Sequence, residues 1–217
     1  MTDFATARRH MVDGQVRTAD VTDLRILDAM LETPRERFVP PASAGLAYLD
    51  LDLSVGGKGS RRLLKPMVLA KLIQAADLAS TDRVLDVGCA TGYTAAVLAR
   101  VAGQVVALEE DSGLAQTARA ALAAQPNVKM VSGPLTAGWP QGAPYDAILL
   151  EGATEIAPQA FLPQLKDGGR LVCILGSGPG TKAMLYCRSG DELGGRPIFD
   201  ANGPLLPGFA KVPAFAF

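Results

Sequence analysis

The stretch VLDVGCATGYTAAVLAR, residues 84–100, decides the fold of this chain. It opens on a short apolar run interrupted only by Asp86, which is typical of a buried β-strand. From Tyr93 onward the small and apolar residues favour a helix. Between the two, Gly88 and Gly92 permit a tight turn and let a ligand approach the backbone. The stretch therefore predicts a strand, a turn and a helix, with a ligand at the carboxyl end of the strand.

The same alternation of strands and helices continues on both sides of this stretch. Strands are expected at 83–88, 104–110, 128–131, 145–152 and 170–176, and helices at 67–78, 93–102, 112–125 and 158–165. Such an order predicts an α/β fold with a Rossmann-like, doubly wound and mostly parallel sheet. A last strand is expected at 182–189, followed by a glycine-rich turn and an irregular arm.

The N-terminal part is expected to add helices to the same domain. One helix is predicted at about residues 3–18 and a second from an N-cap at Thr22 to Pro34. The segment from residue 35 to residue 65 shows no clear helical or strand periodicity. A loop of that length in a compact chain is usually functional. We therefore expect residues 1–65 to form N-terminal helices and a functional loop, joined to a ligand-binding domain with a C-terminal arm at 66–217.

Composition narrows the classes of protein. The formal net charge of the 217 residues is −1, so a basic stripe for nucleic acid is not expected. The three cysteines form no CxxC pair, which favours free thiols in a reducing compartment and argues against a metal site. There is no apolar run of membrane-spanning length and no secretory pattern at the start. The sequence therefore favours the cytoplasm, without a membrane partner.

The spacing in the glycine turn indicates which ligand it suits. A dinucleotide pyrophosphate calls for GxGxxG, whereas this turn reads Asp86-x-Gly88-x-x-x-Gly92. A carboxylate repels phosphate but suits the cationic amino acid end of S-adenosylmethionine (SAM). Glu109, at the end of the next predicted strand, can accept hydrogen bonds from ribose hydroxyls. The pattern favours SAM and disfavours an NAD-dependent dehydrogenase.

Beyond this pattern, the chain resembles the protein-L-isoaspartate O-methyltransferase family over nearly its full length. The segments that carry the resemblance are TDLRILDAMLETPRERFVP (22–40), AYLDLDLSVG (47–56), VLDVGCATGYTAAVLA (84–99), GPLTAGWPQGAPYDAILLEGA (133–153) and QLKDGGRLVCILGS (164–177). The resemblance implies a class I SAM-dependent methyltransferase whose acceptor is an isoaspartyl-containing protein or peptide. It also implies a set of cofactor-binding positions: Asp86, Gly88, Cys89, Ala90, Gly92, Glu109 and Glu110.

The chain departs from the family pattern at two places. Leu64 stands where the family has a serine in its substrate loop, and Gly133-Pro134 replaces a Gly-Asp pair whose carboxylate would bind the adenine amino group. The loop residues to be considered for the acceptor are Ser60, Arg61, Arg62 and Leu64. The two arginines are either an anion clamp for the acceptor carboxylate or solvated surface charges. Glu151 either contacts the substrate or caps a turn.

No residue is predicted as a certain catalytic group, and the reaction does not demand one. A carboxylate acceptor is already ionised at neutral pH, so a general base is not required. The single histidine, His10, is expected on the surface of the first helix. Two alternatives remain open at this point: a methyltransferase with another carboxylate or small acceptor, and a non-catalytic SAM-binding or scaffold protein. The departures at Leu64 and Pro134 are the reason for keeping both.

Overall fold

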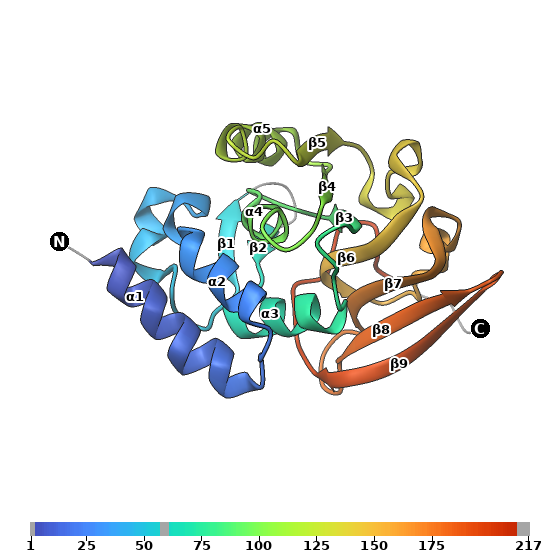
Figure 1. Ribbon diagram of the computed structural model, residues 1–217, viewed down its shortest axis with the longest axis horizontal. Helices are drawn as coiled ribbons and strands as arrows, with labels where there is room; N and C mark the ends of the chain where they lie inside the picture. The colour runs from blue at the N-terminus through green and yellow to red at the C-terminus, as the bar shows by residue number, and fades with distance from the viewer. Residues whose placement is uncertain (1–2, 57–60, 212–217) are drawn as a thin grey trace, which may run out of the picture.

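A seven-stranded sheet in the order β5-β4-β3-β6-β7-β8-β9 organises the computed structural model, which describes residues 3–56 and 61–211 (Figure 1). The strands are β3 (Arg83–Val87), β4 (Gln104–Glu109), β5 (Val128–Ser132), β6 (Tyr145–Thr154), β7 (Leu165–Leu175), β8 (Lys182–Ser189) and β9 (Glu192–Asp200). The strands β3, β4, β5, β6 and β7 run parallel to one another. The strands β8 and β9 pair antiparallel to their neighbours. The predicted mostly parallel sheet is confirmed.

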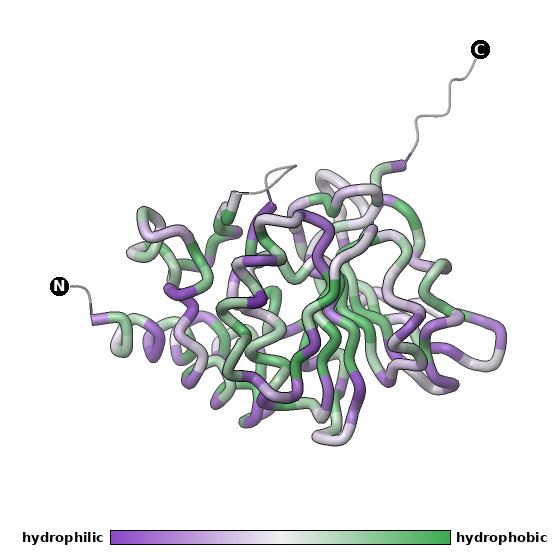
Figure 2. The backbone as a smooth tube through the Cα atoms, turned by 90° about the horizontal axis from the view of Figure 1, so that it is seen from above, coloured by the Kyte–Doolittle hydropathy of each residue, from purple (hydrophilic) through white to green (hydrophobic). Residues whose placement is uncertain are grey.

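The central strands are apolar because both faces of the sheet are covered. β3 lies between β4 and β6, with Leu85 opposite Val106 on one side and Ile148 on the other. All three of these side chains are buried. Figure 2 shows the hydrophobic colour concentrated where the strands run side by side, with polar segments outside them. This burial places the carboxyl ends of β3, β4 and β6 at one edge of a rigid sheet.

Five α-helices within the described ranges pack around the sheet and beside it: α1 (Phe4–Met11), α2 (Leu24–Glu32), α3 (Pro66–Ala75), α4 (Tyr93–Leu98) and α5 (Ser112–Ala121). A π-helical turn and a short 3₁₀ turn extend α1 to Ala19. The N-cap of α2 is Asp23, whose carboxylate accepts from the Arg25 N–H, so the prediction of Thr22 is wrong by one residue. Aspartate ranks above threonine as an N-cap residue.

Three other predictions need correction. The expected α-helix at 158–165 is a 3₁₀ helix, Gln159–Gln164, because Pro163 lies within it and cannot donate an α-helical hydrogen bond. The strand expected at 170–176 begins earlier, at Leu165, and its first part is irregular where the pairing with β6 shifts. The glycine-rich segment after β8 forms the hairpin partner β9, although its two central glycines and Pro197 disfavour a strand.

The N-terminal segments share one hydrophobic core with the sheet. A buried cluster includes Met11, Leu27 and Tyr48 together with Val84 and Val97. In Figure 1, α1 lies at one end of the molecule and the β8–β9 hairpin toward the other. A separate antiparallel pair, β1 (Leu53–Gly56) and β2 (Arg61–Leu63), lies before α3. This small sheet places Arg61 beside the end of β4 in the main sheet.

The C-terminal arm runs beside β6. Ala153 N–H donates to the Pro204 carbonyl, with N and O 2.7 Å apart, and Leu206 N–H donates to the Ala153 carbonyl at 2.9 Å. The Leu206 side chain is buried in a second hydrophobic cluster, which includes Leu85 and Leu150. The arm thereby covers the end of β6 near the glycine turn. No helix of the described ranges is long and apolar enough to span a membrane.

Candidate functional site

The glycine turn after β3 has left-handed backbone geometry at three positions: Gly88 (φ +82°), Ala90 (φ +51°) and Gly92 (φ +94°). A side chain at either glycine would be strained, which explains the glycines. Gly88 and Cys89 both donate their N–H to the Leu108 carbonyl, with N–O distances of 2.9 and 3.1 Å. The turn is therefore fixed to the end of β4.

Glu109, at the end of β4, is fully buried and holds this turn through its carboxylate. Its Oε2 accepts the Ala90 N–H at 2.8 Å. Its Oε1 accepts the N–H groups of Glu110 and Asp111 at 3.0 and 3.1 Å. These bonds keep Ala90 in its left-handed conformation and direct the carboxylate toward the turn. The structure thus brings together the predicted residues Glu109 and Ala90.

Asp86, at the end of β3, is buried and neither carboxylate oxygen has a hydrogen-bond partner among the described residues. Burial raises its pKa well above the usual range, and the nearby carboxylates of Glu151 and Glu109 raise it further. An orphaned buried carboxylate is costly. Two acceptor oxygens in this buried position suit a cationic or hydrogen-bonding ligand.

Glu151, on β6, is the third buried carboxylate at this edge. Its Oε2 accepts from the Thr94 hydroxyl at 2.7 Å, whereas Oε1 has no partner within the described ranges. Burial raises the pKa of Glu151 to about 7, while the hydrogen bond from Thr94 and the charge of Arg61 partly offset that rise. Glu151 lies inside a strand, so the alternative that it caps a turn is wrong.

The raised pKa of Glu151 predicts a pH dependence of stability. The stabilising effect of protonation is complete below the unfolded pKa of 4.5 and is lost as the pH rises through about 7. Glu151→Gln keeps an acceptor for Thr94 but removes the charge. We expect its melting temperature to exceed that of the wild type at about pH 8, and the difference to shrink at about pH 5. Thermal melts at both pH values check this, and an equal difference would contradict it.

The two arginines of β2 have different environments. Arg61 is buried, and its Nη2 donates to the Gly88 carbonyl at 2.5 Å and to Glu109 Oε2 at 3.1 Å. Arg62 is exposed and donates from Nη1 to the Asp52 carbonyl at 3.2 Å. Arg62 agrees with the solvated alternative. Arg61 is neither solvated nor directed at an external anion in this structure, because it pairs with Glu109.

The remaining predicted site residues divide between core, surface and the undescribed segment. Leu64 is buried in the hydrophobic core, and its carbonyl accepts from Arg35. Burial raises the pKa of the Cys89 thiol well above its usual range, so this thiol is not poised as a nucleophile. Glu110 is exposed and accepts the Leu135 N–H at 3.3 Å. Ser60 lies outside the described residues.

Sequence reasoning does not single out two residues that position the site. Arg35 is buried, donates to the carbonyls of Ala47 and Leu64 at 3.0 and 2.8 Å, and lies 4.6 Å from the Tyr93 ring centroid. The Thr91 hydroxyl donates to the Phe38 carbonyl at 2.5 Å. Both residues tie the glycine turn and α4 to the N-terminal segments. The only signal for this in the sequence is the PRERFVP string around Arg35.

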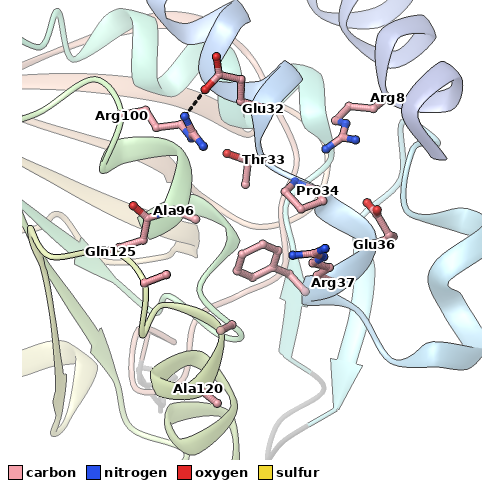
Figure 3. A pocket seen from close by; sticks show the side chains of 13 residues that line it. Arg8, Glu32, Thr33, Pro34, Glu36, Arg37, Ala96, Arg100, Ala120 and Gln125 are labelled. Carbon is pink, nitrogen blue, oxygen red and sulfur yellow. Dashed lines mark hydrogen bonds and ion pairs between the residues drawn. The ribbon is translucent and has the colours of Figure 1, made fainter.

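Three clefts adjoin these elements. The smallest, about 220 Å³, is lined by Arg61, Glu109, Glu110 and Asp111. A second, about 680 Å³, runs from the N-terminal segments to β1 and the glycine turn, which it reaches at Thr91. A third, about 690 Å³, lies between α1, the end of α2, α4 and α5, with Arg8, Arg37 and the Glu32–Arg100 ion pair at its wall (Figure 3).

Only the smallest of these clefts contains predicted cofactor-binding residues. No group of three or more His, Cys, Asp and Glu side chains within residues 3–56 and 61–211 is arranged to hold a metal ion.

Comparisons with known proteins show which family the chain is similar to. The family model described as protein-L-isoaspartate(D-aspartate) O-methyltransferase matches residues 6–194. A protein-L-isoaspartate O-methyltransferase from Methylorubrum extorquens (strain PA1) is 43% identical over 191 residues, covering 88% of this chain and 83% of the relative. One from Roseiflexus castenholzii (strain DSM 13941 / HLO8) is 38% identical over 211 residues, covering 96% and 95%.

Solved structures give the same result. A structure named protein-L-isoaspartate O-methyltransferase superposes with a TM-score of 0.80 at 27% identity, covering 93% of this chain, which spans 66% of that chain. A Plasmodium falciparum structure described by the same activity, in complex with S-adenosyl-L-homocysteine, has a TM-score of 0.75, covering 92% of this chain and 97% of its own. At 15% identity the latter shows the fold alone. From the family match and these relatives, the chain belongs to the protein-L-isoaspartate(D-aspartate) O-methyltransferase family.

Proposed function

We propose that the protein transfers a methyl group from SAM to the carboxylate of isoaspartyl residues in damaged proteins. Family membership supports the reaction class. The observation that carries the proposal is the arrangement of Asp86 and Glu109 on the two sides of the left-handed glycine turn. Both carboxylates are buried at the carboxyl ends of adjacent parallel strands, where ligands of open α/β sheets bind.

The residues present fit SAM better than a phosphate-bearing cofactor. Asp86 has two acceptor oxygens without partners, which suit the ammonium of an amino acid. Glu109 offers a carboxylate of the kind that accepts a ribose hydroxyl. Three buried carboxylates at this edge, those of Asp86, Glu109 and Glu151, would repel a pyrophosphate. Gly88 leaves room for close approach of a ligand to the turn.

When bound, SAM supplies a methyl carbon on a positively charged sulfur, so the acceptor oxygen–carbon bond forms as the carbon–sulfur bond breaks and a neutral thioether leaves. The acceptor carboxylate is already ionised at neutral pH, and no side chain has to remove a proton. The task of the protein is to hold the reactants in line and to exclude water. The buried Asp86 and Glu109 carboxylates are placed to orient the cofactor.

We assign the acceptor polypeptide to the cleft of about 680 Å³ that reaches the glycine turn at Thr91. Its walls include Phe38, Pro40 and Val55, so it offers an apolar surface to a polypeptide backbone. Arg37 at its edge is exposed and can attract a carboxylate. This cleft borders the turn from the side of the N-terminal segments, whereas Glu109 faces the smaller cleft.

The direct test compares two peptides of identical sequence, one with isoaspartate and one with aspartate. We expect the protein to incorporate a labelled methyl group from SAM into the isoaspartyl peptide alone, as a base-labile ester. Methylation of neither peptide by a protein that binds S-adenosylhomocysteine (SAH) would favour a different carboxylate acceptor. The apolar Leu64 in the core, without a hydroxyl, is the observation that supports this second candidate.

Three further parts of the proposal rest on composition and packing. Cys89 and Cys173 are buried free thiols and Cys187 is an exposed one, which supports a reducing compartment such as the cytoplasm. The net charge of −1 supports a protein that does not bind nucleic acid. The hydrophobic cluster that joins Met11 and Leu27 to Val84 supports a single domain made from residues 1–65 and 66–217.

Pro134 provides a gain-of-affinity prediction. Its backbone angles, φ −59° and ψ 130°, are accessible to any residue, so aspartate fits there without strain. We expect Pro134→Asp to bind SAH about fivefold more tightly, because one added hydrogen bond to the adenine amino group contributes about 1 kcal/mol. Calorimetric titration measures the change, with Pro134→Ala as the control for loss of the proline. Equal affinities of the two variants would contradict the prediction.

A further inference from the structure

The Arg61 guanidinium lies in the space that the glycine turn leaves open. Its side chain is only 1% exposed, and Nη2 contacts both the Gly88 carbonyl and Glu109 Oε2. A Cβ atom added to Gly88 would lie 2.7 Å from this same nitrogen. The room that glycine provides for a ligand above the turn is therefore filled by a side chain of the protein itself.

Arg61 also occupies the last acceptor site of Glu109. A carboxylate has about four lone-pair positions. Three of those of Glu109 accept the N–H groups of Ala90, Glu110 and Asp111, and Arg61 takes the fourth. The backbone bonds belong to the turn and to the end of β4, so they are fixed by the fold. One ribose hydroxyl can therefore bind this carboxylate, and only after Arg61 leaves it.

In its contact with Glu109, Arg61 leaves some of its own hydrogen-bond donors unpaired. Its Nε and Nη1 are buried without a hydrogen-bond partner among the described residues. Arg35, equally buried, leaves only Nη1 without a partner among the described residues, because Nε and Nη2 each donate to a main-chain carbonyl and the guanidinium stacks on Tyr93. Burying unpaired donors costs free energy. Arg61 thus differs from Arg35 in being held by a contact that can be exchanged.

The electrostatic setting favours an exchange of one cation for another. The buried carboxylates of Asp86, Glu109 and Glu151 lie at this edge, and the charge of Arg61 lowers the pKa of both Asp86 and Glu151. SAM carries a sulfonium and an ammonium. Its arrival would return positive charge to these carboxylates as the guanidinium withdraws.

We propose that Arg61 is an internal competitor of the cofactor: its guanidinium occupies the place of the ribose on Glu109, and the cofactor binds by displacing it. This inference rests on the proposed function, because it concerns regulation of the same SAM site. Displacement makes the affinity for cofactor depend on the fraction of molecules in which Arg61 is released. The neighbouring Arg62 takes no part, since it is exposed and bound to the Asp52 carbonyl.

Calorimetric titration of SAH into three proteins tests the proposal. Arg61→Gln is expected to bind SAH about tenfold more tightly than the wild type, as removal of a competing state predicts. Arg62→Gln, the matched control on the same strand, is expected to bind like the wild type. Unchanged or weaker binding by Arg61→Gln would overturn the proposal.

A second measurement uses the wild-type protein and does not depend on how the variant folds. In ¹⁵N-labelled protein, the Arg61 Nε–H is expected to exchange slowly with water when free and rapidly when SAH is saturating. Slow exchange in both states would overturn the proposal.

The outcomes separate the two claims. Tighter binding by Arg61→Gln without methylation of an isoaspartyl peptide would contradict the proposed acceptor and leave the displacement intact. Absence of SAH binding by every variant would overturn both.

Discussion

Asp86→Asn is expected to weaken SAH binding about 100-fold without lowering the melting temperature. Hydrogen bonds between charged groups contribute up to about 3 kcal/mol, which corresponds to this factor. Asp86 is buried with both oxygens unpartnered, so the folded protein gains nothing from its charge. The isosteric amide removes the charge that attracts the ammonium of the ligand. Calorimetry and thermal melts measure the two effects on the same preparation.

The combination of the two results distinguishes a binding role from a structural one. If Asp86 served the fold, its replacement would lower the melting temperature and affinity together. Asp77→Asn is the matched control, because Asp77 is exposed and its left-handed backbone (φ +47°) suits asparagine equally well. It should change neither quantity. Binding by Asp86→Asn within threefold of the wild type would remove Asp86 from the site.

Glu109→Gln is expected to lower the melting temperature by about 10 °C and to abolish measurable SAH binding. Removing one charge of a buried ion pair costs about 3–5 kcal/mol because the partner stays buried, and each kcal/mol corresponds to about 2–4 °C in a chain of this size. Here the partner is Arg61, whose side chain is 1% exposed. The amide NH₂ would also face a backbone N–H of the turn, such as that of Ala90.

A double variant shows how much of this loss arises from the unpaired arginine. Arg61→Met removes the guanidinium, so Arg61→Met/Glu109→Gln should recover part of the stability lost in Glu109→Gln alone. SAH binding should remain absent, because the ribose acceptor is still missing. Additive effects of the two substitutions would show that the Arg61–Glu109 contact contributes little. Glu110→Gln, a change at the adjacent exposed carboxylate, is the control for stability.

Sequence alone predicts the parts of this fold that local pattern determines. The run from Val84 to Arg100 encodes strand, turn and helix through burial and two glycines, and the structure has all three. Where propensity and tertiary pairing disagree, the prediction is wrong. β9 forms because β8 supplies it with hydrogen bonds despite Gly194, Gly195 and Pro197.

The candidate site was predictable to the extent that its residues follow strand ends. Asp86 and Glu109 each end a parallel strand, so adjacency in the sheet brings them together. The Arg61–Glu109 pair joins residues 48 positions apart, in different sheets, and no local pattern predicts it. The same holds for the absence of partners around Asp86, which depends on the burial contributed by several elements.

A crystal structure of the protein with SAH locates the ligand and Arg61 in a single experiment. We expect a ribose hydroxyl on the Glu109 carboxylate, the ligand ammonium beside Asp86, and Arg61 withdrawn from Gly88 and Glu109. The nucleoside bound elsewhere, for example in the cleft lined by Arg8, Arg37 and Arg100, would contradict the assignment of the cofactor site.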